Sequence, residues 1–518
     1  MRSIAPRNLV TLLVLCAAPA AAMAQTDAPP PAAPPPAAEA PAPAPAEAMP
    51  PPDSPRVDTA MPAPMPPPPP PPVAAPMPPP PPAPPAAPTS YPMTSKFAAT
   101  FYGFAEWDSI FDKTQGLSDL AGNAAIARSG TYTGDHHQLM QSARNSRLGF
   151  KLKGPETETI KSSAIAEVDF LGNQPQSAPA PTGSPAVSEG AFFTNPTLRI
   201  RHFALKLETP IVDILAGQYW QLFGWQSFFT PNTVQIQGLP GEVFGRTPQL
   251  RISHTFKTEA VNVEIALAAM RPAQRAAYAP DGQGGIKVSI NDWKGVHTNG
   301  STGTALDALS FGVSGLVRRL DIPEFSATPT GSNKVLGWGI SADGMFPIIP
   351  AKTAHDGGLT LTGSYAYGKA DADQYTSLSG GASFAALPNP NMTSPAPAYT
   401  QNVDNGLVAY TSDGVLHAIK WQSYMAGIQA YLPTAVTGVR MWVAGNYSHM
   451  NSPNIADLMT TANASRIFNK MDWIDGNYFV DATASIRFGA EYAWTQQTYL
   501  DGVKASNYRV QLSGWYIF

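Results

Sequence analysis

The last twelve residues, Asn507-Tyr-Arg-Val-Gln-Leu-Ser-Gly-Trp-Tyr-Ile-Phe518, decide how the rest of the chain is interpreted. A period of two is the spacing of a β-strand whose faces meet different surroundings, such as lipid and water, although a soluble edge strand can alternate in the same way. Every second residue counted back from the end is apolar or small: Phe518, Tyr516, Gly514, Leu512 and Val510. The interleaved residues become polar and cationic away from the end: Ile517, Trp515, Ser513, Gln511 and Arg509.

A final strand that ends in an aromatic residue resembles the assembly signal of bacterial outer-membrane β-barrels. Phe518, Tyr516 and Leu512 carry this resemblance. It implies that the barrel-assembly machinery is a partner, and that the upstream chain supplies the other strands of a barrel.

The N-terminus has the three parts of a secretory signal peptide, which we place at residues 1–24. Arg2 and Arg7 precede a short apolar run, and Ala22-Met-Ala24 provides a cleavage site. The only cysteine, Cys16, lies inside this segment, so the exported protein is expected to contain no disulfide bond. The alternative that Cys16 is the lipidated cysteine of a lipoprotein is disfavoured, because such sites have a small residue just before the cysteine and Leu15 occupies that position here.

Residues 25–94 are almost entirely proline and alanine and contain 32 of the 56 prolines. Such a segment has few backbone donors and little to bury, so it is expected to be disordered or polyproline-II-like. We interpret it as a periplasmic linker that precedes a barrel at 95–518. A specific grip on peptidoglycan or on a periplasmic partner is the alternative.

The barrel prediction rests on segments of about ten residues that alternate in polarity, while no stretch of 18 apolar residues predicts a membrane-spanning helix. Their even number suits a transmembrane, antiparallel, up-and-down, all-β barrel with both termini on the periplasmic side. Short connections alternate with long ones, and the long segment 221–246 is expected to fold inward and narrow the lumen. The sixteen predicted strands are 101–108, 147–153, 160–170, 197–207, 212–220, 248–256, 261–270, 286–290, 309–318, 335–345, 359–368, 415–431, 439–448, 478–482, 486–494 and 508–518.

Four stretches resemble the DcaP-like outer-membrane porins, a family related in general pattern to the phosphate-selective porins. They are Glu167-Val-Asp-Phe-Leu-Gly172, Leu198-Arg-Ile-Arg-His-Phe203, Ala216-Gly-Gln-Tyr-Trp220 and Arg246-Thr-Pro-Gln-Leu-Arg251. The resemblance, which covers roughly 101–518, implies a homotrimer of sixteen-stranded barrels, each with its third loop in the pore, that passes small anions such as dicarboxylates. Family members often carry a helical stretch before the barrel, and the Pro/Ala tract occupies that place here.

The strand phase predicts which charged side chains face the lumen. Rings of Arg and Lys suit the passage of anions through a narrow pore, whereas a solvated ladder of balanced charges would set little selectivity. The expected cations are Arg147, Lys151, Lys153, Arg199, Arg201, Arg251, Arg318, Arg440, Arg487 and Arg509, with Arg246 at the end of the inward segment. The expected acids are Glu106, Asp108, Glu167, Asp169, Glu264, Asp343 and Glu491.

Other signals predict no cofactor, no metal and no enzyme. Asp135-His-His137 has too few converging ligands for a metal, and Asp281-Gly-Gln-Gly-Gly285 lacks the lysine of a phosphate loop and is interpreted as a turn. A net charge of −4 argues against a nucleic-acid partner. On the apolar phase, the following aromatics are expected to form membrane-interface girdles or a subunit contact: Trp107, Trp338, Trp421, Tyr492, Trp494 and Tyr516.

The sequence therefore predicts a passive-diffusion porin in the outer membrane of a Gram-negative bacterium, with its N-terminal arm in the periplasm and a preference for small anionic solutes. The alternative is an envelope-tethering protein whose arm engages the cell wall while the barrel acts as an anchor.

Overall fold

The computed structural model describes residues 97–121, 125–172, 196–235, 238–326, 329–378, 403–411, 413–459 and 464–518. The predicted signal peptide and the Pro/Ala-rich segment 25–94 lie outside these residues. In the described part of the chain, no helix has the length and hydropathy needed to cross a membrane.

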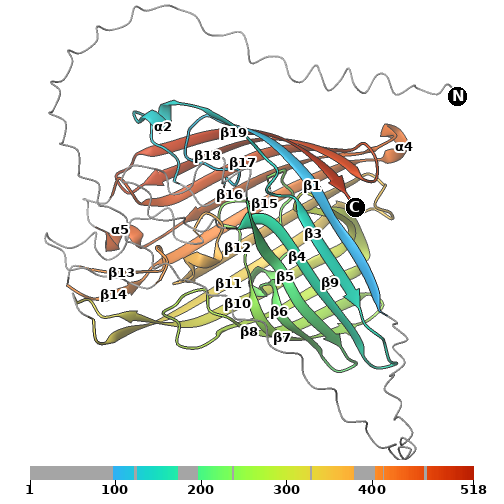
Figure 1. The fold of residues 1–518 in the computed structure, drawn as a ribbon, viewed down its shortest axis with the longest axis horizontal. Helices are drawn as coiled ribbons and strands as arrows, with labels where there is room; N and C mark the ends of the chain where they lie inside the picture. The colour runs from blue at the N-terminus through green and yellow to red at the C-terminus, as the bar shows by residue number, and fades with distance from the viewer. Residues whose placement is uncertain are drawn as a thin grey trace, which may run out of the picture. The chain divides into compact units, whose positions relative to one another are not determined.

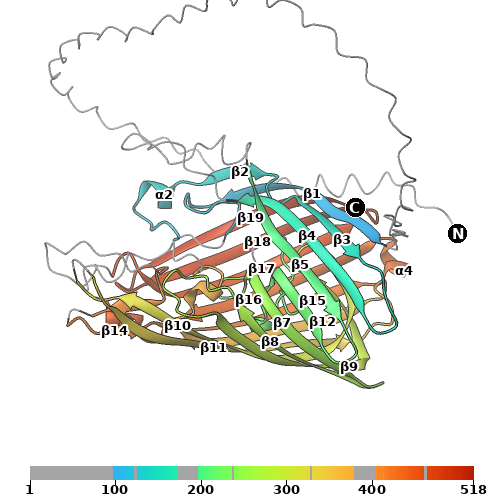
Figure 2. The ribbon, with the colours of Figure 1, turned by 60° about the horizontal axis from the view of Figure 1, so that its bottom comes forward.

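The larger of the two sheets in the described part of the chain closes into one antiparallel barrel (Figure 1, Figure 2). Its sheet has seventeen strands, but β2 (Gln138–Ser142) and β3 (Arg147–Lys153) pair with successive parts of β1 (Ala98–Asp112) and share one position in the wall. The expected sixteen-stranded barrel is thereby confirmed. β1 closes the ring against β19 (Lys504–Ile517). Between β3 and β19 the wall strands are β4 (Lys161–Gly172), β5 (Thr197–Glu208), β6 (Asp213–Trp220), β7 (Arg246–Lys257), β8 (Val261–Met270), β9 (Asp281–Asn299), β10 (Gly303–Pro323), β11 (Ser332–Ile349), β12 (Gly358–Lys369), β15 (Lys420–Leu432), β16 (Arg440–Asn451), β17 (Phe468–Asp481) and β18 (Ile486–Tyr499).

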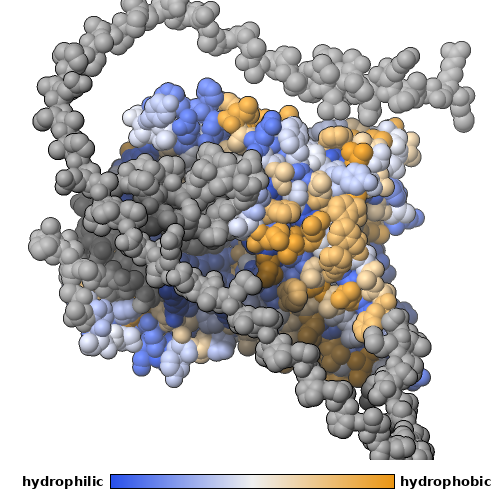
Figure 3. All heavy atoms as spheres, in the orientation of Figure 1, coloured by the Kyte–Doolittle hydropathy of each residue, from blue (hydrophilic) through white to orange (hydrophobic). Residues whose placement is uncertain are grey.

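The two faces of the wall differ as the period-two pattern predicts. On β19, Tyr516 and Leu512 are 57% and 48% exposed on the outer face, whereas Arg509 and Trp515 are buried on the inner face. Figure 3 shows a broad apolar area over the strands of the visible face. The C-terminal Phe518 lies at the seam, where its ring stacks on Phe101 at 5.1 Å.

Short connections gather at the end of the barrel where β1 begins and β19 ends, which we call the turn end. They join β3 to β4, β5 to β6 and β7 to β8. The opposite end, the loop end, carries small elements outside the wall: α2 (Tyr132–Asp135), η2 (Ala372–Gln374), α5 (Ile455–Leu458) and the two-stranded sheet of β13 (Val408–Tyr410) and β14 (Leu416–Ala418). The helix α4 (Thr434–Thr437) lies in a connection at the turn end.

Several predicted boundaries were wrong. Residues 281–285 are not a turn but the start of β9. The strands on both sides supply hydrogen-bonding partners, with Asp281 opposite Met270 and Gly282 opposite Val317. This pairing outweighs the weak strand preference of glycine. β9 and β10 also extend through most of the expected connection 291–308, and β17 starts ten residues before the predicted strand 478–482. The predicted strand 415–431 is divided between β14 and β15.

Candidate functional site

The segment between β6 and β7, residues 221–245, lies against the inner face of the wall from its first turn, η1 (Phe223–Trp225). The backbone N–H groups of Leu222 and Phe223 both donate to Oε1 of Gln283 on β9, at 2.9 and 2.8 Å. A side chain of the wall thus supplies the acceptor that an irregular segment lacks within its own backbone.

Two glycines of the wall make room for Trp225. A Cβ atom at Gly285 on β9 would lie 3.0 Å from the indole, and one at Gly312 on β10 would lie 2.6 Å from it. The indole N–H also donates to the carbonyl oxygen of Val313 at 3.2 Å. Glycine is therefore required at both positions for the segment to approach the wall this closely.

The middle of the same segment reaches the opposite side of the ring. Asn232 accepts a hydrogen bond from Nε1 of Trp442 on β16 at 2.8 Å, and Val234 N–H donates to Oδ1 of Asn477 on β17 at 2.9 Å. Since β16 and β17 stand across the barrel from β6 and β7, residues 221–245 span the interior.

The last part of the segment is joined to the connection after β12. The carbonyl oxygen of Glu242 accepts from Thr376 N–H, and Phe244 N–H donates to the carbonyl oxygen of Gln374, both at 2.9 Å. The Glu242 carboxyl is buried beside a cavity of about 10 Å³ that Asp343 also lines. Burial in this setting raises the pKa of Glu242 to about 8.

The inner face of β3–β7 carries a cluster of cations, which we call the basic wall. Two carboxylates of β4 lie within it: Arg201 binds Glu167 at 2.6 Å and Asp169 at 3.1 Å, and Arg199 binds Asp169 at 2.6 Å. The strand phase predicts that all of these cations face the lumen, but it does not predict that they form one cluster. The cations of the basic wall are Arg147, Lys151, Lys153, Arg199, Arg201, Arg246 and Arg251.

On the basic wall the carboxylates are buried, whereas several of the cations are exposed. The side chains of Asp169 and Glu167 are only 0% and 7% exposed, whereas that of Arg199 is 34% exposed, and Lys151 is exposed too. Arg246 has no ion-pair partner among the described residues, and its guanidinium lies over the rings of neighbouring aromatics, with Trp220 at 4.6 Å. The charge that a solute meets on this wall is therefore positive.

The other four predicted cations are held in ion pairs elsewhere on the inner face. Arg509 makes two hydrogen bonds to Asp112, at 2.9 and 2.8 Å, with both side chains buried. Both Arg440 and Arg487 bind Asp481. Arg318 binds Asp281 and Asp373, at 2.5 and 2.6 Å. These pairs leave little free charge at the four positions, so the accessible cations of the predicted set lie on the basic wall.

The remaining predicted acids are engaged in contacts within the protein. Glu491 accepts the Gln235 N–H at 2.8 Å and so helps to hold the inward segment. Glu106 accepts from Nδ2 of Asn145 at 2.7 Å, and Asp108 accepts from the Gln511 amide at 3.1 Å. Glu264 pairs with Lys287 at 2.9 Å, and Asp343 accepts from the hydroxyl of Ser341 at 3.1 Å.

A row of aromatic side chains that was not predicted from the sequence lies on the inner face near the turn end. Trp442 stacks between Tyr431 at 5.6 Å and Phe479 at 4.8 Å, and Phe479 lies 6.2 Å from Trp515. Period-two alternation already puts Trp515 on the polar, interleaved face of the last strand, and the same counting along β15, β16 and β17 could have placed the other three there. Trp421 was wrongly assigned to the outer face: it is buried on the inner face, because residues 406–410 of the preceding connection pack over it and its indole N–H donates to the Gly406 carbonyl oxygen at 3.0 Å.

Asp135 and His136, from the stretch 135–137, make local contacts within their own loop. Asp135 accepts from the N–H of Gly130, and the ring of His136 stacks on Tyr132 at 4.0 Å. Among the described residues, no group of three or more His, Cys, Asp or Glu side chains is arranged to hold a metal ion.

Comparison with known proteins defines the class of fold. No protein-family model and no curated protein matches the chain. Among solved structures, the chain is similar to the outer membrane channel DcaP of Acinetobacter baumannii, with a TM-score of 0.57 and 17% sequence identity over 82% of this chain and 97% of that chain. This likeness shows a shared barrel fold, and it agrees with the resemblance seen in the sequence.

Two further structures match with lower scores. The anion-selective porin from Comamonas acidovorans has a TM-score of 0.44 and 10% identity, covering 82% of this chain and all of that chain. OmpT of Vibrio cholerae, in a trimer form, has a TM-score of 0.44 and 9% identity, covering 82% of this chain and 99% of that chain.

Proposed function

We propose that the protein is an outer-membrane porin through which small hydrophilic solutes diffuse passively, with a preference for anions such as dicarboxylates. The apolar outer face of the barrel meets lipid, and the turn end faces the periplasm, as the positions of both termini of the barrel suggest. The functional unit is a homotrimer, and the segment 25–94 is a periplasmic arm.

The observation that carries the anion preference is the difference in exposure on the basic wall. Arg199, Lys151 and Lys153 present charge to water, whereas Glu167 and Asp169 are buried under arginines. A cleft lined by accessible charge of one sign raises the local concentration of the opposite ion, and a narrow lumen strengthens this effect.

The segment 221–245 fits the porin assignment, because it crosses the interior between opposite sides of the wall and so reduces the cross-section of the lumen. A barrel of sixteen strands otherwise leaves a wide aqueous interior. We infer that this segment sets the size limit and that the basic wall beside it sets the charge preference.

Planar-bilayer recording of the purified protein in a KCl gradient tests the proposal. We expect ohmic conductance steps and a reversal potential of the sign that anion selectivity gives. A folded barrel without conductance would overturn the porin assignment, and a reversal potential of the opposite sign would overturn the anion preference alone.

Tethering of the envelope is the second candidate function, and the proline-rich composition of 25–94 is the observation that favours it. Deleting 25–94 separates the two. A porin keeps its conductance after the deletion, whereas a tether loses its association with isolated cell walls.

A further inference from the structure

The hairpin that joins β9 to β10 leaves the wall and turns into the barrel. Regular pairing stops at a bulge after Ile290 and Leu309, and a second paired stretch then runs from Lys294 opposite Ala308 to Asn299 opposite Gly303. We call residues 294–308 the inner hairpin. Its residues 296–298 (Val-His-Thr) are fully buried, which a turn extending into water would not achieve.

One side chain of β15 clamps the inner hairpin at Thr298. The Thr298 N–H donates to Oε1 of Gln429 at 2.9 Å, and Nε2 of Gln429 donates back to the Thr298 carbonyl oxygen at 3.1 Å. The side-chain amide of Gln429 thus makes the two hydrogen bonds that the backbone of a neighbouring strand would make with Thr298. The hydroxyl of Tyr431 adds a contact of 2.6 Å to the Thr298 hydroxyl.

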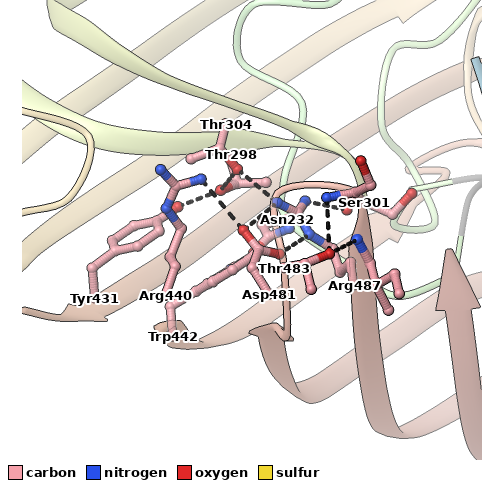
Figure 4. Close-up of polar contacts among 12 residues, drawn as sticks. Asn232, Thr298, Ser301, Thr304, Tyr431, Arg440, Trp442, Asp481, Thr483 and Arg487 are labelled. Atoms are coloured by element: carbon pink, nitrogen blue, oxygen red, sulfur yellow. Dashed lines mark hydrogen bonds and ion pairs between the residues drawn. The ribbon is translucent and has the colours of Figure 1, made fainter. Parts of the chain in front are cut away.

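The tip of the inner hairpin reaches β18. Nη1 of Arg487 donates to the Ser301 carbonyl oxygen at 2.8 Å, and Nη2 donates to the hydroxyl of Thr304 at 3.3 Å (Figure 4). Asp481 holds the same guanidinium at 2.6 Å. Five strands of the ring (β11, β12, β15, β16 and β17) separate β10 from β18, so the inner hairpin crosses much of the lumen.

At the tip, the inner hairpin also meets the segment 221–245. Nδ2 of Asn232 donates to the Gly300 carbonyl oxygen at 2.6 Å, and Val296 packs in one buried cluster with Val234 and Trp442. Two inward elements that start from different parts of the wall therefore make contact, and both are fixed to β16–β18.

We propose that the inner hairpin is a second constriction element, on the periplasmic side of the segment 221–245, and that it determines the largest solute that the pore admits. The inference rests on the proposed porin function. It follows from volume: a two-stranded ribbon across a sixteen-stranded ring takes up space that water would otherwise fill. Side-chain hydrogen bonds hold the inner hairpin in place, and a variant can remove them without changing the backbone pairing of the wall strands.

The test removes the inner hairpin and keeps the wall. Replacing residues 295–307 with Asn-Gly connects the paired neighbours Lys294 and Ala308 by a two-residue turn. The matched control replaces α4 (Thr434–Thr437), an exposed turn at the same end of the barrel, with Asn-Gly. The change in electrophoretic mobility on heating shows whether each variant has formed a barrel.

We expect the shortened protein to have a larger single-channel conductance than the wild type and to admit larger neutral oligosaccharides in a liposome-swelling assay. The α4 control keeps the wild-type values. A folded variant without the inner hairpin, but with unchanged conductance and an unchanged size limit, would overturn the inference. Absence of conductance in the wild type itself would instead overturn the porin function.

A second variant covers the case in which the shortened chain does not assemble. Gln429→Leu combined with Tyr431→Phe removes the clamp on Thr298 and leaves every residue of the inner hairpin in place. We expect openings of increased conductance that the wild type lacks, while a record identical to that of the wild type would refute the inference.

Discussion

Replacement of Arg246 by glutamine is the most direct test of the charge preference. Arg246 belongs to the basic wall and has no ion-pair partner among the described residues, so its removal leaves no carboxylate without its partner. Its contacts with the rings of Trp220 and Phe244, at 4.6 and 5.3 Å, contribute about 0.5–2 kcal/mol to stability. We therefore expect Arg246→Gln to fold.

The effect on selectivity follows from Coulomb's law. Because Nη1 of Arg246 is buried, a monovalent anion in the lumen passes about 8 Å from the charge, where Coulomb's law gives about 0.5 kcal/mol of stabilisation in water. That free energy corresponds to about a 2.4-fold increase in the local anion concentration, and a cation is depleted by the same factor. Arg246→Gln is therefore expected to lower the ratio of anion to cation permeability by at least about fivefold.

The assay is the reversal potential of the reconstituted channel in a KCl gradient, with Arg319→Gln as the matched control. Arg319 follows Arg318 on β10 and so lies on the opposite face of the strand; it pairs with Asp321 at 2.9 Å. We expect no shift in the control. An unchanged reversal potential in Arg246→Gln, or an equal shift in both variants, would refute the assignment of Arg246 to the selective region.

Three further predictions concern pH, stability and assembly. Burial raises the pKa of Glu242 from 4.5 to about 8, so between these pH values the folded segment 221–245 retains a proton that the unfolded chain releases. The stability of the segment therefore falls as the pH rises from about 4.5 to 8. Channel noise should increase over the same pH range in the wild type but not in Glu242→Gln. Asp112→Ala leaves the buried Arg509 without its carboxylate, with only the carbonyl oxygens of Ser118 and Asp119 still accepting from it, and should lower the free energy of unfolding, measured in urea, by about 3–5 kcal/mol; an unchanged midpoint would contradict this. Deleting Phe518 should reduce the heat-modifiable, assembled fraction, and equal assembly of both proteins would argue against its role as part of the signal.

The barrel was predictable because alternation is local. In β18 and β19 the inner and outer residues can be read two positions at a time, and the structure keeps that phase. Glycine misled the prediction at 281–285, since Gly285 makes room for Trp225 within a strand rather than forming a turn. No local pattern distinguishes these two uses.

The pairing of the inner charges was not predictable from the sequence. Arg509 and Asp112 are 397 positions apart, and only closure of the ring brings them together. The same holds for Arg318, whose partner Asp373 lies beyond the end of β12. The strand phase predicts which face a side chain occupies, but the three-dimensional arrangement decides which cations remain accessible.

The inner hairpin also constrains the order in which the chain is assembled. Residues 294–308 leave the wall after its eighth strand, yet Gln429 and Arg487, which hold them, belong to strands that come later in the chain. A partly inserted barrel that lacks β15 and β18 has no place for this ribbon. Final positioning of the hairpin must therefore wait until those late strands have arrived, so a truncated chain that stops before residue 429 would carry a loose hairpin inside an open sheet.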